Sequence, residues 1–101
     1  MSEHYDQLEV RDAEQRELAQ FNLLPGLIAR AMQEAPGWAS QLAGVDAAGV
    51  TSREALAALP ILRKGALKDL QAKNPPFGGF AASPAGAVAR VFMSPGPIFE
   101  P

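Results

Sequence analysis

The spacing of apolar residues predicts a chain built mainly from short helices. From residue 12 onward, apolar side chains recur three or four positions apart, which is the period of one helix face. The clearest such face consists of Leu27, Ile28, Ala31, Met32 and Ala35. Asp12 begins this region as a helix N-cap, with Gln15 as its capping-box partner. Pro25 interrupts the pattern, so the sequence predicts either a kink or a new helix capped by Asn22.

Proline and glycine residues divide the following segment into shorter helices. Pro36 and Gly37 end the long apolar face, and a short helix follows them up to Gly44. Thr51 and Glu54 have the spacing of a capping box at the start of the next helix. Leu59-Pro60 ends that helix.

The last third of the chain changes from helical to extended character. Residues 64–72 predict one more short helix, with Leu67 and Leu70 inward and no capping residue at its start. Residues 74–86 are too rich in proline and glycine for regular structure. The run 87–93, AVARVFM, alternates and predicts a strand covered on both faces. A lone strand leaves its backbone unpaired, so we expect the sheet to be completed by a partner chain or by sequence missing after residue 101.

The predicted organisation has three parts. Residues 1–11 form a flexible N-terminus, residues 12–74 a helical N-terminal subdomain, and residues 75–101 a Pro/Gly loop with the first strand. The fold class is mainly α, with four or five short helices leading into the first strand of a larger α/β domain.

Composition and charge exclude several classes of function. A net charge of −2 argues against a nucleic-acid partner, because phosphate binding needs a basic surface. The absence of cysteine removes disulfides, thiolate catalysis and Cys-type zinc sites. His4 is the only histidine, so no Ser-His-Asp set can be assembled, and we expect no catalytic residue or metal site in this chain. No signal peptide or bilayer-spanning run is present, which predicts a cytoplasmic protein without a membrane partner.

The stretch Ser94-Pro95-Gly96-Pro97 is the candidate for chemistry. A strand that enters a turn of small residues is a usual place for a phosphate-binding loop, because freed backbone N–H groups converge there. A plain proline turn is the alternative, and the residues by themselves favour it.

The order of motifs resembles the N-terminal segment of phenylacetate–CoA ligases, which belong to the ANL superfamily of AMP-forming adenylating enzymes. Four pieces carry this resemblance, in order: LIARAMQEAPGW, AGVDAAGVTSREALAALPILRKGAL, PPFGGF and VARVFMS. In the second piece, Leu59-Pro60 and Lys64 are in register with the family pattern. The resemblance implies the start of an α/β adenylate-forming domain, in a parent that uses Mg·ATP and CoA.

The family's nucleotide loop reads Ser-Ser-Gly-Thr-Thr-Gly-Lys-Pro, and SPGPIFEP aligns with it. Ser94, Gly96 and Pro101 keep the family residue. The replaced positions are Pro95, Pro97, Ile98, Phe99 and Glu100. The two prolines have no N–H to offer a phosphate, and Glu100 puts an acid where the family has a cation. By resemblance, Ser94, Gly96, Pro97 and Glu100 therefore mark a degenerate nucleotide loop.

The resemblance thus implies a fragment of a ligase that adenylates an aryl or acyl carboxylate and passes it to CoA. We expect the fragment to be inactive alone, to hold no cofactor, and to associate with the remainder of its parent chain or with itself as a dimer. The alternative is a non-catalytic paralogue or a helical dimerisation or interaction module.

Overall fold

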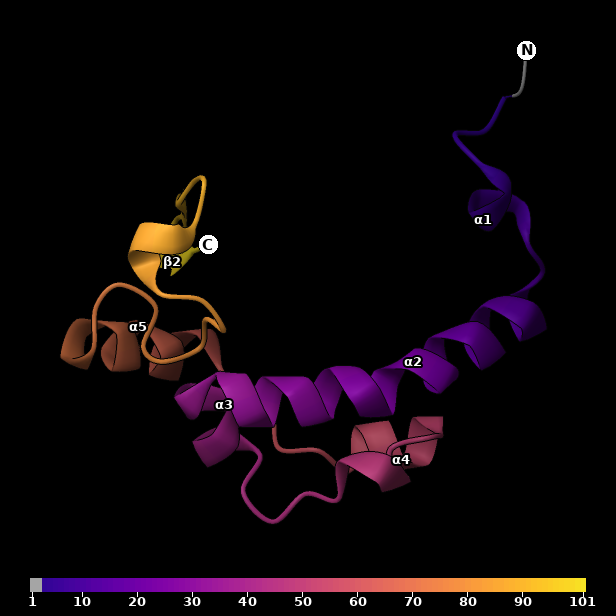
Figure 1. The fold of residues 1–101 in the computed structure, drawn as a ribbon, viewed down its shortest axis with the longest axis horizontal. Coiled ribbons are helices and arrows are strands. Elements are labelled where there is room, and N and C mark those ends of the chain that lie inside the picture. Colours follow the sequence, from indigo (N-terminus) through magenta and orange to yellow (C-terminus); the bar gives the residue numbers. More distant parts are fainter. Residues whose placement is uncertain (1–2) are drawn as a thin grey trace.

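The structure is a computed structural model that describes residues 3–101, and it confirms a mainly helical chain with one short sheet (Figure 1). The α-helices are α1 (Gln7–Val10), α2 (Ala13–Glu34), α3 (Pro36–Gln41), α4 (Arg53–Ala57) and α5 (Lys64–Lys73). The 3-10 turns are η1 (Ala47–Gly49) and η2 (Ala85–Ala87), and the strands are β1 (Phe92–Ser94) and β2 (Ile98–Glu100). In Figure 1, α2 runs along the molecule, α4 lies below it, and α5 with the hairpin lies beyond the α3 end.

The longest element, α2, is one continuous helix of 22 residues that passes through Pro25. Its predicted start is confirmed, because the Asp12 carboxylate accepts a hydrogen bond from the Gln15 N–H at 2.8 Å. The prediction of a new start capped by Asn22 is wrong, since Asn22 lies inside the helix. Pro25 removes one intrahelical donor. Packing of the apolar face on both sides of it, by Leu24 and Ile28, outweighs that loss.

Two other helix starts differ from the sequence prediction. The N-terminal segment contains the one-turn helix α1, because the Asp6 carboxylate accepts hydrogen bonds from Leu8 and Glu9 N–H. The cap of α4 is Ser52, one residue later than the predicted Thr51, and its hydroxyl accepts from the Ala55 N–H at 3.2 Å. Ser52 has the extended backbone that a capping residue adopts, which places its oxygen over the first turn.

The core is small and lies where α2, α3 and the segment around η1 meet. Its buried side chains are Ile28, Leu42 and Val50. The partly buried side chains around them are Leu24, Met32, Trp38, Val45, Ala47, Ala55 and Leu59. Within residues 3–101, no helix combines the length and the apolar character needed to cross a bilayer.

The chain exposes much more surface than a closed domain of its size. Its accessible surface is 7571 Å², whereas a folded monomer of this mass exposes roughly 5,500 Å². The radius of gyration is 16.3 Å, against about 13 Å for a compact domain of 100 residues. Large aliphatic side chains contribute to this surface, such as Leu23 at 75% and Ile61 at 74% exposure. The extra surface, about 2,000 Å², exceeds the roughly 800 Å² that one partner buries in a standard protein–protein interface.

The predicted strand over residues 87–93 is shorter and less covered than expected. Only Phe92–Ser94 is a strand, and Phe92 and Met93 are 58% and 67% exposed. Its partner is β2, which pairs with it antiparallel in the register Phe92↔Glu100, Met93↔Phe99 and Ser94↔Ile98. The expectation that the pairing strand must come from outside the chain is therefore wrong. Gly96 makes the reversal possible, because its φ of +143° is open to glycine and strained for other residues.

The α5–hairpin half meets the α2–α3 half at a joint formed by Gly37, Trp38, Gly79 and Phe80. The Gly37 N–H donates to the Gly79 carbonyl oxygen at 2.8 Å. The Trp38 and Phe80 rings stack edge to face, with centroids 5.1 Å apart. Two segments about 40 positions apart in the sequence are thus in direct backbone contact, and this contact orients the hairpin relative to the long helix.

Candidate functional site

All four residues predicted for the nucleotide loop lie in the hairpin. Ser94 ends β1 and pairs with Ile98, while Gly96 and Pro97 form the turn. Glu100 ends β2, opposite Phe92, and its side chain is exposed. The hairpin therefore places Gly96 and Pro97 at its turn and Glu100 at its open end, with β2 packed along α5.

A buried glutamine attaches the hairpin to α5. The Gln71 side chain is only 5% exposed. Its Nε2 donates to the Phe99 carbonyl oxygen, and its Oε1 accepts from the Phe99 N–H, both at 2.9 Å. One side-chain amide thus satisfies both backbone groups of a residue 28 positions away.

Gln71 was not found by sequence reasoning, which placed Leu70 on the inward face of this helix. Leu70 is 37% exposed, and Gln71 takes the buried position instead. A signal was available, because residue 71 lies four positions after the inward-facing Leu67 and so on the same helix face. Because glutamine is polar, the sequence pattern did not predict that residue 71 is buried. A buried polar group needs a hydrogen-bond partner, and only the tertiary fold reveals that partner.

A small cavity of about 260 Å³ lies between α5 and the hairpin. Its lining residues are Lys68, Gln71, Ala72, Pro75, Pro97 and Phe99. The hydrogen-bonded amide of Gln71 forms part of the wall, and Lys68 supplies its one charge.

The hairpin turn has a cation beside it. A Cβ placed on Gly96 would lie 3.1 Å from Lys64 Cε and 3.6 Å from Lys64 Nζ, so the lysine tip lies against the turn. Lys64 is the first residue of α5, and the described residues contain no ion pair to it. Glu100 is likewise in no ion pair of residues 3–101. The turn therefore combines one lysine amine with a backbone in which Pro95 and Pro97 offer no N–H.

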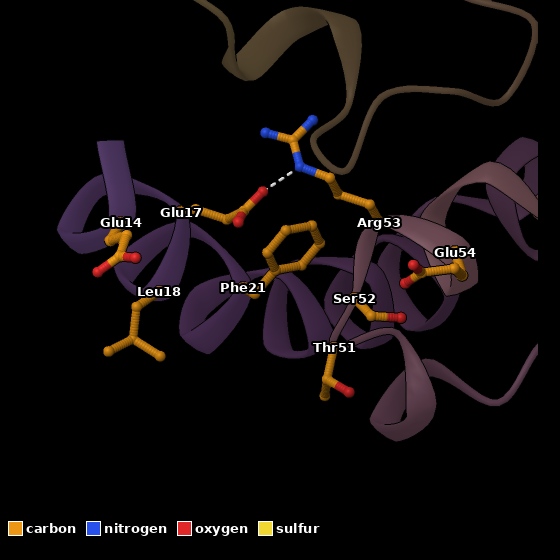
Figure 2. A pocket seen from close by; sticks show the side chains of 8 residues that line it. All are labelled: Glu14, Glu17, Leu18, Phe21, Thr51, Ser52, Arg53 and Glu54. Atoms are coloured by element: carbon orange, nitrogen blue, oxygen red, sulfur yellow. Dashed lines mark hydrogen bonds and ion pairs between the residues drawn. The ribbon is translucent and has the colours of Figure 1, made fainter. Parts of the chain in front are cut away.

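A second hollow, of about 520 Å³, lies between the start of α2 and the start of α4 (Figure 2). Its lining residues are Glu14, Glu17, Leu18, Phe21, Thr51, Ser52, Arg53 and Glu54. Figure 2 shows Glu17 and Arg53 joined as an ion pair above the Phe21 ring. Although three carboxylates line it, no group of three or more metal-ligating side chains occurs within the described part of the chain. The Glu17–Arg53 ion pair spans this hollow and connects α4 to α2, which accounts for charged side chains in its lining.

Comparison with known proteins gives a structural match but no sequence match. No protein-family model and no curated protein sequence matches the chain. Two solved structures match, both of 2-hydroxyisobutyryl-CoA ligase in the postadenylation state. The complex with 2-HIB-AMP has a TM-score of 0.75 and 27% identity over 86% of this chain. The complex with R3-HIB-AMP has a TM-score of 0.81 and 23% identity over 98% of this chain.

The match concerns a limited part of those ligases. The chain covers 19% of the first structure and 23% of the second, so it spans about a fifth of their length. The helical order and the short terminal sheet correspond to an N-terminal piece of the adenylate-forming domain, as the family resemblance implied. The chain therefore has the fold of part of an adenylate-forming acyl-CoA ligase.

Proposed function

We propose that this chain is the N-terminal segment of an AMP-forming acyl-CoA ligase. The observation that carries the proposal is the structural match to an adenylating CoA ligase at 27% identity over 86% of the chain. The parent would activate a carboxylic acid with Mg·ATP and transfer the acyl group to CoA. These substrates are intracellular, so the proposal includes a cytoplasmic location.

Two observations bear on the identity of the carboxylic acid substrate. The sequence pattern resembles phenylacetate–CoA ligases, whereas the structural neighbours act in 2-hydroxyisobutyryl-CoA formation. We propose an aryl acid or a small hydroxy acid as the substrate class. In the family, the segments that read the acid and the adenine lie downstream, so the 101 residues supply a support layer and the entry to the nucleotide loop.

We propose further that the chain by itself neither binds ATP tightly nor catalyses adenylation. Backbone pairing supports this, because β2 is paired with β1 and the Phe99 N–H is bound by Gln71. Pro95 and Pro97 have no N–H, which leaves the turn with few free donors for a phosphate. The exposed Glu100 carboxylate adds like charge near the expected phosphates.

Acid-dependent ATP–pyrophosphate exchange by the full-length protein tests this function. The panel contains phenylacetate, benzoate and 2-hydroxyisobutyrate, with acetate as the control acid. Exchange that requires one of the first three, followed by formation of its CoA thioester, supports the proposal. ATP binding without exchange for any acid would instead support a non-catalytic paralogue.

The alternative, a helical interaction or dimerisation module, is favoured by one specific observation. The chain exposes about 2,000 Å² more surface than a closed domain of its mass, including many aliphatic side chains. In the ligase proposal, the remainder of the parent chain covers this surface. In the module proposal, a second copy covers it. The sedimentation behaviour of the 101-residue chain and of the full-length protein distinguishes the two.

A further inference from the structure

The contact between Gln71 and Phe99 has the geometry of a strand pairing made by a side chain. An amide side chain presents one donor and one acceptor side by side, as a peptide group of a neighbouring strand does. Gln71 uses both on one residue, with two bonds of 2.9 Å, at a position that is 5% exposed. Among the described residues, no buried side-chain polar atom lacks a partner, so this pairing is complete.

The pairing determines which edge of β2 faces α5. Phe99 is opposite Met93, but its N–H and C=O are bound to Gln71. Antiparallel pairs alternate between hydrogen-bonded and non-hydrogen-bonded positions, so Met93 and Phe99 form a non-hydrogen-bonded pair whose backbone groups on β2 point outward. A shift of the hairpin by one residue would leave the Gln71 amide buried and unpaired, which is costly.

The turn depends on this register. Gly96 lies three residues before Phe99, and the Lys64 tip lies against it. Lys64 and Gln71 are two turns apart on α5, so one rigid helix holds both the anchor of β2 and the cation beside the turn.

We propose that Gln71 is the positioning residue of the hairpin, and that it fixes the turn of Gly96 and Pro97 against Lys64. The inference rests on the proposed function in one respect, namely that this turn faces the phosphates of a nucleotide. The positioning itself concerns only the chain's own residues and is measurable without nucleotide.

The decisive variant is Gln71→Glu, because only its protonated state has a hydrogen-bond donor to pair with the Phe99 carbonyl oxygen. The protonated acid has one O–H donor and one C=O acceptor and reproduces the amide pairing. The carboxylate has acceptors only and faces the Phe99 carbonyl oxygen. A free glutamate has a pKa of about 4.3, and burial favours the neutral form. The charged groups nearby are Lys68, which lines the same cavity, and Glu100, the charged residue of β2.

The first measurement is nuclear magnetic resonance on the 101-residue chain. In the unchanged chain, we expect a protected Phe99 amide and a nuclear Overhauser contact between Lys64 Hε and Gly96 Hα, at both acidic and neutral pH. In Gln71→Glu at neutral pH, the protection should fall about tenfold and the contact should disappear, whereas both should return on acidification. Gln20→Glu, the same change on an exposed face of α2, should show neither effect. Protection and contact that persist in Gln71→Glu after its carboxyl group has ionised, or that do not return once it is protonated, would overturn the proposal.

The second measurement relates the hairpin position to nucleotide in the full-length protein. We expect Gln71→Glu to raise KM for ATP about tenfold at neutral pH while kcat changes less. On acidification, the KM of the variant should approach that of the unchanged protein. If the unchanged protein shows no ATP–pyrophosphate exchange, the proposed function fails, but the resonance measurement still decides the role of Gln71. If exchange occurs and the variant matches the unchanged protein at neutral pH, the positioning role is wrong.

Discussion

Replacing Gly37 by alanine should open the joint between the two halves of the molecule. A Cβ at this position would lie 2.8 Å from Phe80 Cδ2 and 2.9 Å from the carbonyl carbon of Gly79. Ordinary contact begins at 3.4 Å, and one of the two neighbours is backbone, so the segments must separate by about 0.5 Å. The hydrogen bond from Gly37 N–H to the Gly79 carbonyl, now 2.8 Å long, would lengthen with them.

The expected cost is the sum of three effects. Overpacking costs about 1–3 kcal/mol, and weakening the hydrogen bond costs up to about 1 kcal/mol. The exchange of glycine for alanine within a helix returns about 0.5–1 kcal/mol. The net change in the free energy of unfolding is therefore between about 0 and 3.5 kcal/mol of destabilisation, with a central value of about 2 kcal/mol.

Urea unfolding, followed by circular dichroism at the helical band, measures this change. The matched control is Gly26→Ala, because Gly26 lies inside α2 and a Cβ there would meet nothing within 4 Å. The control should stabilise the chain by about 0.5–1 kcal/mol through helix propensity alone. If Gly37→Ala unfolds at the same urea concentration as the unchanged chain, or a higher one, the joint does not have the tight geometry described here.

Three further predictions test the caps, the loop and the exposed surface. Ser52→Ala should destabilise the chain by about 1 kcal/mol in the same unfolding assay, whereas Thr51→Ala should leave the free energy of unfolding nearly unchanged. The reverse result would show that Thr51, as the sequence predicted, caps α4. In the full-length protein, Phe99→Gly with Glu100→Lys should strengthen ATP binding measured by calorimetry, whereas Glu14→Lys should not; tight binding that is unchanged or weakened by the double variant would contradict a degenerate loop. The 101-residue chain should sediment as a dimer or larger species, because its apolar surface is uncovered, and a clean monomer at millimolar concentration would refute this.

Local signals in the sequence were enough to predict α2 to α5, but neither α1 nor the contacts between distant segments. The Asp12 cap and most of the apolar face around Ile28 depend on residues within one or two turns and were predicted correctly, whereas Leu27, which was predicted on that face, is 62% exposed. Continuity through Pro25 depends on packing from α3 and η1, so local propensity alone pointed to a possible break. The strand partner and the Gln71 anchor required knowledge of a chain reversal and of a contact 28 residues apart. The same limit applies to the loop, whose residues were found by resemblance while the side chains that hold it were not.

The Gln71 pairing also gives the two edges of the hairpin different capacities for aggregation. An unpaired strand edge is a template for another chain, and proteins avoid such pairing by covering the edge. On β2, Phe99 has no free backbone group left, because α5 supplies the amide that a foreign strand would otherwise provide. On β1, the backbone N–H and C=O of Met93, the partner of Phe99 in a non-hydrogen-bonded pair, point away from β2 and form the other edge. Growth of this sheet, whether by a further strand of the same chain or by a misfolded neighbour, is therefore directed to the β1 side.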